Sequence, residues 1–258
     1  MTGATNWAPG LVETHSSIIV FVGDRAYKLK KPLDLGFVDF TTPEARRLAC
    51  HRETELNRRL APDVYLGVAD ILGVDGVVCD HLVVMRRMPA DRRLSTLVLA
   101  DVPVDDHLRH IAHQLAALHA RADGNAATNE AASVSATRAW WRSNTDAMLA
   151  MESSPFAREV IVTVQALADR YLEGRSPLFE HRIRAGRAVD GHGDLLADDI
   201  FCLDAGPRVL DCLEFDDRLR VGDGLADAAF LGMDLERLGR PDLGARFLEH
   251  YRELAGDV

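Results

Sequence analysis

Apolar and polar positions divide the chain into a strand-rich first third and a helix-rich remainder. Residues 16–30, SSIIVFVGDRAYKLK, hold two short runs on either side of Gly23-Asp24, a pattern typical of a β-hairpin. Thr42-Pro43 is typical of a helix start, and the spacing over residues 45–60 predicts one helix. Further apolar runs predict three strands, at residues 65–68, 71–72 and 77–85. The first 88 residues therefore predict a small sheet with one helix.

Beyond residue 88 the apolar spacing becomes mainly helical. Helices are predicted over residues 106–121, 139–151, 156–173, 225–238 and 243–254. Residues 122–137 are rich in Ala, Ser, Asn and Gly, which predicts a mobile connector or, alternatively, a helix with a weak apolar face. Two more strands are predicted at residues 200–203 and 209–213, joined by the turn Asp204-Ala205-Gly206-Pro207. The pattern as a whole indicates an α+β protein.

The composition is that of a globular chain. Its 258 residues are 47% hydrophobic and 27% charged, enough for a packed core and unlike a collagenous or disordered chain. The longest apolar runs, residues 18–22 and 82–85, are far shorter than the ~20 residues that cross a bilayer, so no membrane association is expected. Residues 1–15 lack the cationic and apolar regions of a secretory signal, which predicts a cytoplasmic protein. The four cysteines have no metal-site spacing and are interpreted as reduced packing thiols.

Negative charge is concentrated in one segment. The formal net charge is −10, which argues against nucleic acid as a partner because phosphate binding requires clustered Lys and Arg. Residues 190–236 contain thirteen acidic residues and three arginines, and this difference of ten equals the negative net charge of the whole chain. Apolar residues such as Ile200, Val209 and Leu213 alternate through this segment. We therefore expect it to be folded around a sheet rather than disordered.

Three carboxylates in this segment suggest phosphoryl transfer. The string GHGDLLADDI (residues 191–200) places Asp194 and Asp199 five residues apart, and Asp211 follows twelve residues later. The predicted hairpin can bring all three into a small volume, where they would repel one another unless a cation lay between them. Oxygen ligands without a Cys or His cluster favour Mg²⁺, which binds one or two carboxylates together with the phosphates of a substrate.

The same residues carry a family resemblance that spans residues 12–251. An aspartate in a predicted loop is followed by a second acid five positions later, by a hairpin and by a third aspartate. This order resembles the protein-kinase fold. The form HGD resembles the aminoglycoside phosphotransferase-like family, bacterial small-molecule kinases that include a branch of uncertain substrate. Five further strings match that branch: ETHSS (13–17), YKLKKP (27–32), FVDFTT (37–42), DCLEF (211–215) and FLGMDL (230–235).

The resemblance implies a two-lobed protein-kinase-like fold. A nucleotide-binding sheet lobe with one helix would cover residues 1–88, and a larger, mainly helical catalytic and substrate lobe would cover residues 89–258. ATP would lie in the cleft between the lobes and react with a hydroxyl of a small molecule. The acidic segment suits a cationic acceptor such as an amino sugar or an aminoglycoside, although Mg²⁺ and phosphates would neutralise part of its charge. No protein partner can be named from the sequence.

Roles in the catalytic loop also follow from the resemblance. Asp194 would orient the acceptor hydroxyl, and Asp199 and Asp211 would hold Mg²⁺. Asp199 departs from the asparagine that is common in the family, and Asp198 is its alternative as ligand. His192 would either order the loop backbone or transfer a proton, and the first role is favoured.

The nucleotide-binding residues are expected in the sheet lobe. Strand alternation places Lys28 and Lys30 on one face, and either could hold the phosphates of ATP. Glu53 matches the helix glutamate that pairs with this lysine, with Glu55 as its rival. Backbone amides and the hydroxyls of Ser16 and Ser17 could cover the phosphates, although the turn lacks the glycines of protein kinases.

Several other residues have more than one interpretation. Asp223 and Asp227 resemble the family aspartate that supports the catalytic loop. Trp140 and Trp141 could line a substrate site or serve helix packing. His119 is expected to be a core histidine with its hydrogen bonds satisfied.

Alternative functions are less well supported by the sequence. No Gly-Lys-Ser or Gly-Lys-Thr occurs in the 258 residues, which excludes a P-loop kinase. A catalytically weak nucleotide-binding regulator is one alternative, but every charged role is filled. A Ser/Thr protein kinase is another, but no Ala-Pro-Glu ends the segment between Asp211 and Asp223.

Overall fold

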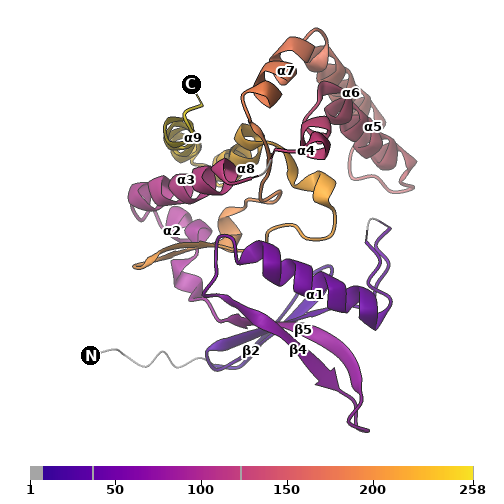
Figure 1. The fold of residues 1–258 in the computed structure, drawn as a ribbon, viewed down its shortest axis with the longest axis vertical. Helices are drawn as coiled ribbons and strands as arrows, with labels where there is room; N and C mark the ends of the chain where they lie inside the picture. The colour runs from indigo at the N-terminus through magenta and orange to yellow at the C-terminus, as the bar shows by residue number, and fades with distance from the viewer. Residues whose placement is uncertain (1–7, 37, 123, 258) are drawn as a thin grey trace.

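The computed structural model describes residues 8–36, 38–122 and 124–257, and it confirms the two-part α+β architecture (Figure 1). Residues 1–7 of the predicted first lobe, Phe37 of the FVDFTT string and Asp123 of the predicted connector lie outside the described residues. A five-stranded antiparallel sheet occupies the N-terminal part, and the C-terminal part is mostly helical. The division into domains at residue 88 stays a prediction.

The N-terminal sheet has the strand order β1-β2-β3-β5-β4. Its strands are β1 (Gly10–Glu13), β2 (Ser17–Val22), β3 (Arg25–Lys30), β4 (Tyr65–Leu72) and β5 (Val78–Arg86). The predicted hairpin is present, and Gly23 supplies the positive φ of 55° that its turn requires. The three strands predicted over residues 65–85 are wrong in number, because β4 is continuous through Leu72 despite a register irregularity near Gly67. Strand β1 was not predicted.

Helix α1 (Pro43–Asn57) lies against this sheet and contacts β4 and β5 (Figure 1). The Thr42 hydroxyl accepts the Ala45 N–H at 3.1 Å, which is the capping bond that the sequence indicates. Cys50, Glu53 and Leu56 are on its buried face. A fully buried glutamate on the sheet-facing side of a helix requires a cationic partner.

The C-terminal part contains the remaining helices and two short antiparallel strand pairs. The longer helices are α3 (Asp105–Ala120), α5 (Val134–Ala150), α6 (Arg158–Leu172), α8 (Gly224–Arg237) and α9 (Pro241–Ala255). The shorter elements are α2 (Leu94–Leu99), α4 (Ala126–Ala131), α7 (Ser176–Arg184), the strand pair β6 (Ala188–Asp190) with β9 (Val221–Asp223), and the pair β7 (Ile200–Leu203) with β8 (Gly206–Val209). The sequence did not predict α2, α7, β6 or β9, which are too short for a clear periodic pattern.

Two predictions in this part are corrected. Residues 122–137 are not a simple connector, because Asn125 caps α4 and Ser133 caps α5. The helical alternative is therefore confirmed. Strand β8 begins at Gly206 and ends at Val209, whereas the sequence predicted residues 209–213. Asp211 consequently follows the strand, in the left-handed conformation with φ 62°.

The core has two clusters, and the smaller one connects the N-terminal sheet to the β7–β8 hairpin. It contains Cys50, Val64 and Val83 from the N-terminal part together with Phe201 and Leu210. The larger cluster lies among α2, α3, α8 and α9 and includes Leu195 and Ile200 of the catalytic segment. Both flanks of the acidic segment are thus anchored by apolar packing, as its alternation predicts.

Two sequence expectations concern the cysteines and membranes. All four cysteines are free, and Cys50, Cys202 and Cys212 are buried as expected, but Cys79 is exposed and does not serve packing. Its position near the distal end of the β4–β5 hairpin leaves it in solvent. Among the described residues, the helices are too short or too polar to cross a bilayer.

Candidate active site

Two lysines of β3 meet the buried glutamate of α1. Lys28 Nζ lies 2.9 Å from Glu53 Oε1, and Lys30 Nζ lies 2.8 Å from Glu53 Oε2. The alternation of the strand places both lysines on the buried face, as predicted. Glu55, the rival of Glu53, is exposed and pairs with Arg52. Burial would raise the pKa of Glu53, but the two lysines outweigh it and keep that pKa below its usual range.

The two lysines differ in their second partner. Lys28 Nζ lies 2.5 Å from Asp211 Oδ1, whose carboxylate is half-exposed. Lys30 Nζ lies 2.5 Å from Glu214 Oε1 and is almost completely buried. Burial acts to lower the pKa of Lys28, but Asp211 and Glu53 outweigh it and raise that pKa well above its usual value. Both amines are therefore cations, and Lys28 is the one that faces an accessible carboxylate.

The loop that begins the GHGDLLADDI string (residues 191–200) is held by backbone hydrogen bonds to one aspartate. Asp227 accepts the N–H groups of His192 and Gly193 at 2.9 and 2.8 Å, and it also accepts from His119 Nε2 at 3.0 Å. The Tyr251 hydroxyl donates to the other nitrogen of His119 at 2.8 Å. Asp227 is therefore the residue that supports the loop, and His119 is the satisfied core histidine that the sequence suggested.

Asp223, the other candidate for that support, has a different position. Its carboxylate caps α8 by accepting the Leu225 N–H at 2.8 Å, and it pairs with Arg182. It makes no contact with the loop backbone among the described hydrogen bonds.

His192 is fully buried and contacts backbone atoms through both ring nitrogens. Nε2 donates to the Leu210 carbonyl oxygen at 3.0 Å, and Nδ1 accepts the Asp194 N–H at 3.3 Å. Burial lowers the pKa of its imidazole. This arrangement orders the loop and leaves no free nitrogen to transfer a proton.

The acidic side chains of the loop lie close enough to influence one another. Burial, followed by the charge of Asp211, raises the pKa of Asp199 to about 7. The same two causes raise the pKa of the half-buried Asp194. Asp198 is exposed and accepts a hydrogen bond from Ser95 Oγ. Asp199 is thus the less exposed of the two neighbouring acids of this string, and its pKa responds to the charge of Asp211.

Asp211 is positioned by contacts on both sides of its left-handed backbone. Its N–H donates to the Tyr65 hydroxyl at 3.2 Å, and the next N–H, of Cys212, donates to Asn57 Oδ1 at 2.8 Å. The Leu210 N–H donates to the Asp199 carbonyl oxygen at 2.9 Å. These bonds connect Asp211 to the sheet, to α1 and to Asp199.

The turn between β1 and β2 is at the place predicted to cover phosphates. The Thr14 N–H donates to the Ser17 carbonyl oxygen at 2.8 Å, and Thr14 Oγ1 accepts the Ser17 N–H at 3.0 Å. Ser17 is fully buried, and its hydroxyl has no hydrogen-bond partner among the described residues. Ser16 is half-buried. The phosphate-covering role of both serines stays a prediction.

Sequence reasoning missed several members of the site. Glu214 pairs with Lys30, Tyr65 and Asn57 hold the backbone around Asp211, and Asp234 accepts the Ala197 N–H at 2.8 Å. Glu214 belongs to the DCLEF string, which could have identified it. Trp140 and Trp141 are exposed on α5, so burial between packed helices does not account for two tryptophans at these positions.

The donor set for a divalent cation is small. No group of three or more His, Cys, Asp or Glu side chains in the described part of the chain is arranged to hold a metal ion. Asp199 and Asp211 therefore make at most a two-carboxylate site. Such a site fits Mg²⁺ only when phosphates and water supply the other oxygens.

Comparisons with known proteins give relatives by sequence and neighbours by structure. No protein-family model matches the chain. Uncharacterized protein Rv2004c of Mycobacterium tuberculosis and Uncharacterized protein Mb2027c of Mycobacterium bovis are each 45% identical to it over 246 residues, which is 95% of this chain. The match covers 49% of each relative, so the chain spans about half the length of these curated relatives.

Three solved structures share the fold over nearly the whole chain. The GDP and kanamycin complex of APH(2")-IIia aligns with a TM-score of 0.56 at 15% identity, over 97% of this chain and 78% of its own. Ethanolamine kinase from Plasmodium vivax gives 0.55 at 13%, over 98% and 69%. A choline/ethanolamine kinase family protein from Mesorhizobium loti gives 0.52 at 15%, over 98% and 71%. The predicted protein-kinase-like fold of the aminoglycoside phosphotransferase type is confirmed.

Proposed function

We propose that this chain, whose fold is that of aminoglycoside phosphotransferases and the choline/ethanolamine kinase family, is an ATP- and Mg²⁺-dependent kinase that phosphorylates a hydroxyl of a small molecule. The observation that carries the proposal is the position of Lys28. Its amine lies between Glu53 (2.9 Å) and Asp211 (2.5 Å), with Asp194 and Asp199 in the same electrostatic cluster. Kinases require a phosphate-binding cation, its glutamate partner and a metal-binding aspartate in this arrangement.

The nucleotide would be held by Lys28 rather than Lys30. Lys28 contacts the half-exposed Asp211 and can exchange that contact for phosphate oxygens. Lys30 is buried between Glu53 and Glu214 and is assigned the role of fixing Glu53. GDP is bound to the aminoglycoside phosphotransferase neighbour, which supports a nucleotide at this site and makes GTP a donor to test beside ATP.

Mg²⁺ would be held by Asp199 and Asp211. The fit rests on the donor set: Asp199 and Asp211 offer hard oxygen ligands, and the hydrogen bond from the Leu210 N–H to the Asp199 carbonyl oxygen (2.9 Å) holds the two positions at the same end of the β7–β8 pair. The charge of Asp211 also helps to raise the pKa of Asp199, a repulsion that a cation would offset. Asp198 is exposed and accepts a hydrogen bond from the Ser95 hydroxyl, so it is not assigned to the metal. When bound, Mg²⁺ would neutralise charge on the phosphate oxygens.

Asp194 is assigned to the acceptor hydroxyl. Its backbone is fixed by His192 and, through Gly193, by Asp227, so the carboxylate is presented from a rigid loop. It would accept or orient the hydroxyl proton while the oxygen attacks the terminal phosphorus in line. Most of the rate enhancement would come from positioning and charge stabilisation.

The test is a donor and acceptor screen with purified protein. ADP or GDP release is measured with Mg²⁺ and a panel of neutral, cationic and acidic hydroxyl compounds, with Asp194→Asn as the control for contaminating kinases. Acceptor-dependent release that Asp194→Asn abolishes supports the proposal. Tight nucleotide binding with no release for any acceptor would instead favour the nucleotide-binding regulator.

A further inference from the structure

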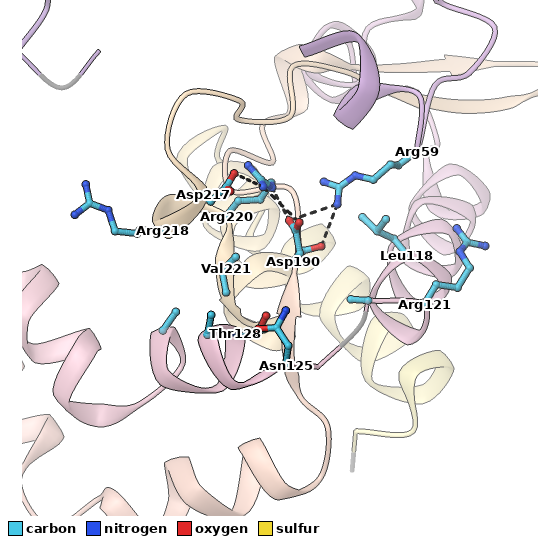
Figure 2. A pocket seen from close by; sticks show the side chains of 13 residues that line it. Arg59, Leu118, Arg121, Asn125, Thr128, Asp190, Asp217, Arg218, Arg220 and Val221 are labelled. Atoms are coloured by element: carbon cyan, nitrogen blue, oxygen red, sulfur yellow. Dashed lines mark hydrogen bonds and ion pairs between the residues drawn. The ribbon is translucent and has the colours of Figure 1, made fainter. Parts of the chain in front are cut away.

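A pocket of about 660 Å³ lies beside the catalytic loop and contains none of the residues assigned to the nucleotide (Figure 2). Its walls come from Arg59 (two residues after α1), the end of α3, helix α4, Asp190 at the end of β6, and four residues between Asp217 and Val221. This volume is in the range of small-molecule sites. The aliphatic part of the lining comprises Leu118, Ala122, Ala127, Ala131 and Val221.

The charge of the pocket differs from that of the segment around it. The lining contains four arginines, Arg59, Arg121, Arg218 and Arg220, but only two carboxylates, those of Asp190 and Asp217. Arg218 is largely exposed and pairs with Asp216, which lies outside the lining. Counting Asp216 still leaves a positive surplus, in a chain of formal net charge −10. An acidic protein with a cationic pocket selects against cationic ligands at that place.

Two of the arginines belong to the wall itself. Arg220 is buried and donates to Asp190, Asp217 and the Leu213 carbonyl oxygen, at 2.5, 2.6 and 2.8 Å. Arg59 donates to the Gly191 carbonyl oxygen at 2.7 Å. These contacts fix the pocket to the start of the catalytic loop.

Arg121 is different because it has no such structural task. It is exposed at the end of α3, and no carboxylate among residues 8–36, 38–122 and 124–257, which the structure describes, pairs with it. Figure 2 shows it on the same side of the pocket as Arg59, with Leu118 between them. A guanidinium that lines a pocket and has no carboxylate partner among the described residues is suited to a carboxylate or phosphate, which it can bind through two parallel hydrogen bonds.

The pocket also lies next to the residue that would receive the acceptor. A Cβ placed on Gly193 would be 2.9 Å from the Leu219 carbonyl oxygen and 3.1 Å from Arg220 Cα. The wall at residues 219–220 therefore packs against the immediate neighbour of Asp194.

We propose that this pocket binds the acidic group, a carboxylate or a phosphate, of the hydroxyl acceptor, and that Arg121 is its main partner. The inference rests on the proposed kinase function and names its substrate class: hydroxyl compounds that also carry an oxyanion. It differs from the cationic amino sugar that the acidic composition of the segment suggests, because the local charge of the pocket is opposite to that of the segment.

The first experiment compares matched acceptors in the wild-type protein and in Arg121→Ala. Glucosamine, glucose, glucuronate and glucose 6-phosphate present similar hydroxyls with different charge, and ATP-dependent ADP release gives kcat and KM for each. We expect the acidic pair to have the lowest KM, and Arg121→Ala to raise it by about tenfold or more with little change in kcat. Arg109→Ala, also exposed on α3 but outside the pocket, should leave KM unchanged.

The outcomes separate this inference from the kinase proposal. Turnover that favours glucosamine, or a KM for the acidic acceptors that Arg121→Ala leaves unchanged, overturns the inference and leaves the kinase function intact. If no acceptor is turned over, calorimetry with inorganic phosphate decides the inference independently. We then expect binding that Lys28→Ala retains and Arg121→Ala loses, and phosphate binding that is absent or follows Lys28 alone would overturn it.

Discussion

At the scale of single residues, the proposed site assigns nucleotide binding and acceptor activation to different side chains. Asp211 contacts Lys28 at 2.5 Å and its charge helps to raise the pKa of Asp199, whereas the Asp194 N–H is held by His192 on the loop. We therefore expect Asp211→Asn to weaken Mg²⁺-dependent nucleotide binding. Asp194→Asn should keep nucleotide binding and lower turnover by about 10²–10⁴-fold, the usual contribution of a general base.

Titration with a fluorescent ATP analogue and measurement of ADP release distinguish the two variants. Thermal melts of both should stay near that of the wild-type protein, which controls for misfolding. Loss of nucleotide binding in a folded Asp194→Asn protein would contradict this division of roles.

Asp199 makes a second residue-scale prediction, on the pH dependence of stability. Its folded pKa is about 7 because of burial and the neighbouring Asp211, whereas an unfolded aspartate has a pKa near ~3.9. The folded state therefore binds more protons between these values, and the free energy of unfolding falls as the pH rises from about 4 to about 7. In Asp199→Asn this side chain is an uncharged amide, so its contribution to the pH dependence of stability is lost.

We expect Asp199→Asn to be more stable than the wild-type protein at pH 8 without Mg²⁺, with a difference that shrinks as the pH is lowered toward 4. Urea unfolding at several pH values measures it. Asp198→Asn is the matched control, because that carboxylate is exposed and should show no comparable trend. A pH-independent difference in the free energy of unfolding for Asp199→Asn would mean that burial and Asp211 do not raise the pKa of this carboxylate.

The sequence indicated which residue types belong to the site, but it did not indicate which side chain each of them would contact. Strand alternation placed Lys28 and Lys30 on one face but could not separate them, because their difference depends on Asp211 and Glu214, more than 180 residues away in the chain. The choice of Asp227 over Asp223 had the same cause. Both flank one helix start, and only the folded loop shows which one reaches its backbone.

At the scale of elements, the catalytic loop is held by α8 and α3 together. Asp227 on α8 satisfies two loop amides, and His119 on α3 fixes that carboxylate. We expect His119→Phe to lower kcat more than it raises KM for ATP, because it loosens the loop but leaves Lys28 and Glu53 in place. Steady-state kinetics at saturating Mg²⁺ measure the two values.

His119→Gln is the comparison that identifies the cause. Its amide can still donate to Asp227, so it should recover part of the kcat. A His119→Phe variant that keeps its kcat while His119→Gln loses it would indicate that the ring volume, rather than the hydrogen bond to Asp227, is what matters.

The contact between α8 and α9 depends on two glycines. A Cβ on Gly244 would lie 2.7 Å from the Gly232 carbonyl oxygen, which is backbone and cannot move easily. A Cβ on Gly232 would lie 3.1 Å from Leu248 Cδ1, the end of a flexible side chain. We expect Gly244→Ala to lower the free energy of unfolding by about 1–3 kcal/mol and Gly232→Ala by less. Chemical denaturation tests this order, and the reverse order would contradict the close approach of the two backbones.

Element prediction succeeded where segments were long and periodic and failed where they were short. Helices α1, α3, α8 and α9 were expected close to their observed positions. Strand β1 and helix α2 are four and six residues long and carry no clear repeat. Residues 122–137 were misleading because Asn125 and Ser133, typical of loops, are helix caps in this position.

At the scale of the whole molecule, the acidic surplus and the site occupy the same segment. Asp194, Asp199 and Asp211 lie between the sheet, which supplies Lys28, and the helical part, which supplies the loop supports. Their hairpin belongs to both core clusters, since Phe201 packs with the sheet and Ile200 packs with the helices. A ligand that neutralises this junction should therefore stabilise both parts together.

Mg²⁺ and ATP should consequently stabilise the protein more together than either does alone. The triphosphate of ATP brings negative charge to a cluster in which Asp211 already repels the charge of Asp199, so ATP requires the cation. The cation in turn has only two carboxylate ligands among the described residues until phosphate oxygens complete its coordination. A ligand at about 100 times its Kd adds roughly 2.7 kcal/mol to the free energy of unfolding. Thermal melts with Mg²⁺, with ATP in EDTA and with both measure the effect, and Asp211→Asn should lose most of the joint increment. An equal increase with ATP in EDTA would contradict the assignment of Asp199 and Asp211 to the metal, while leaving Lys28 as the residue that binds phosphate.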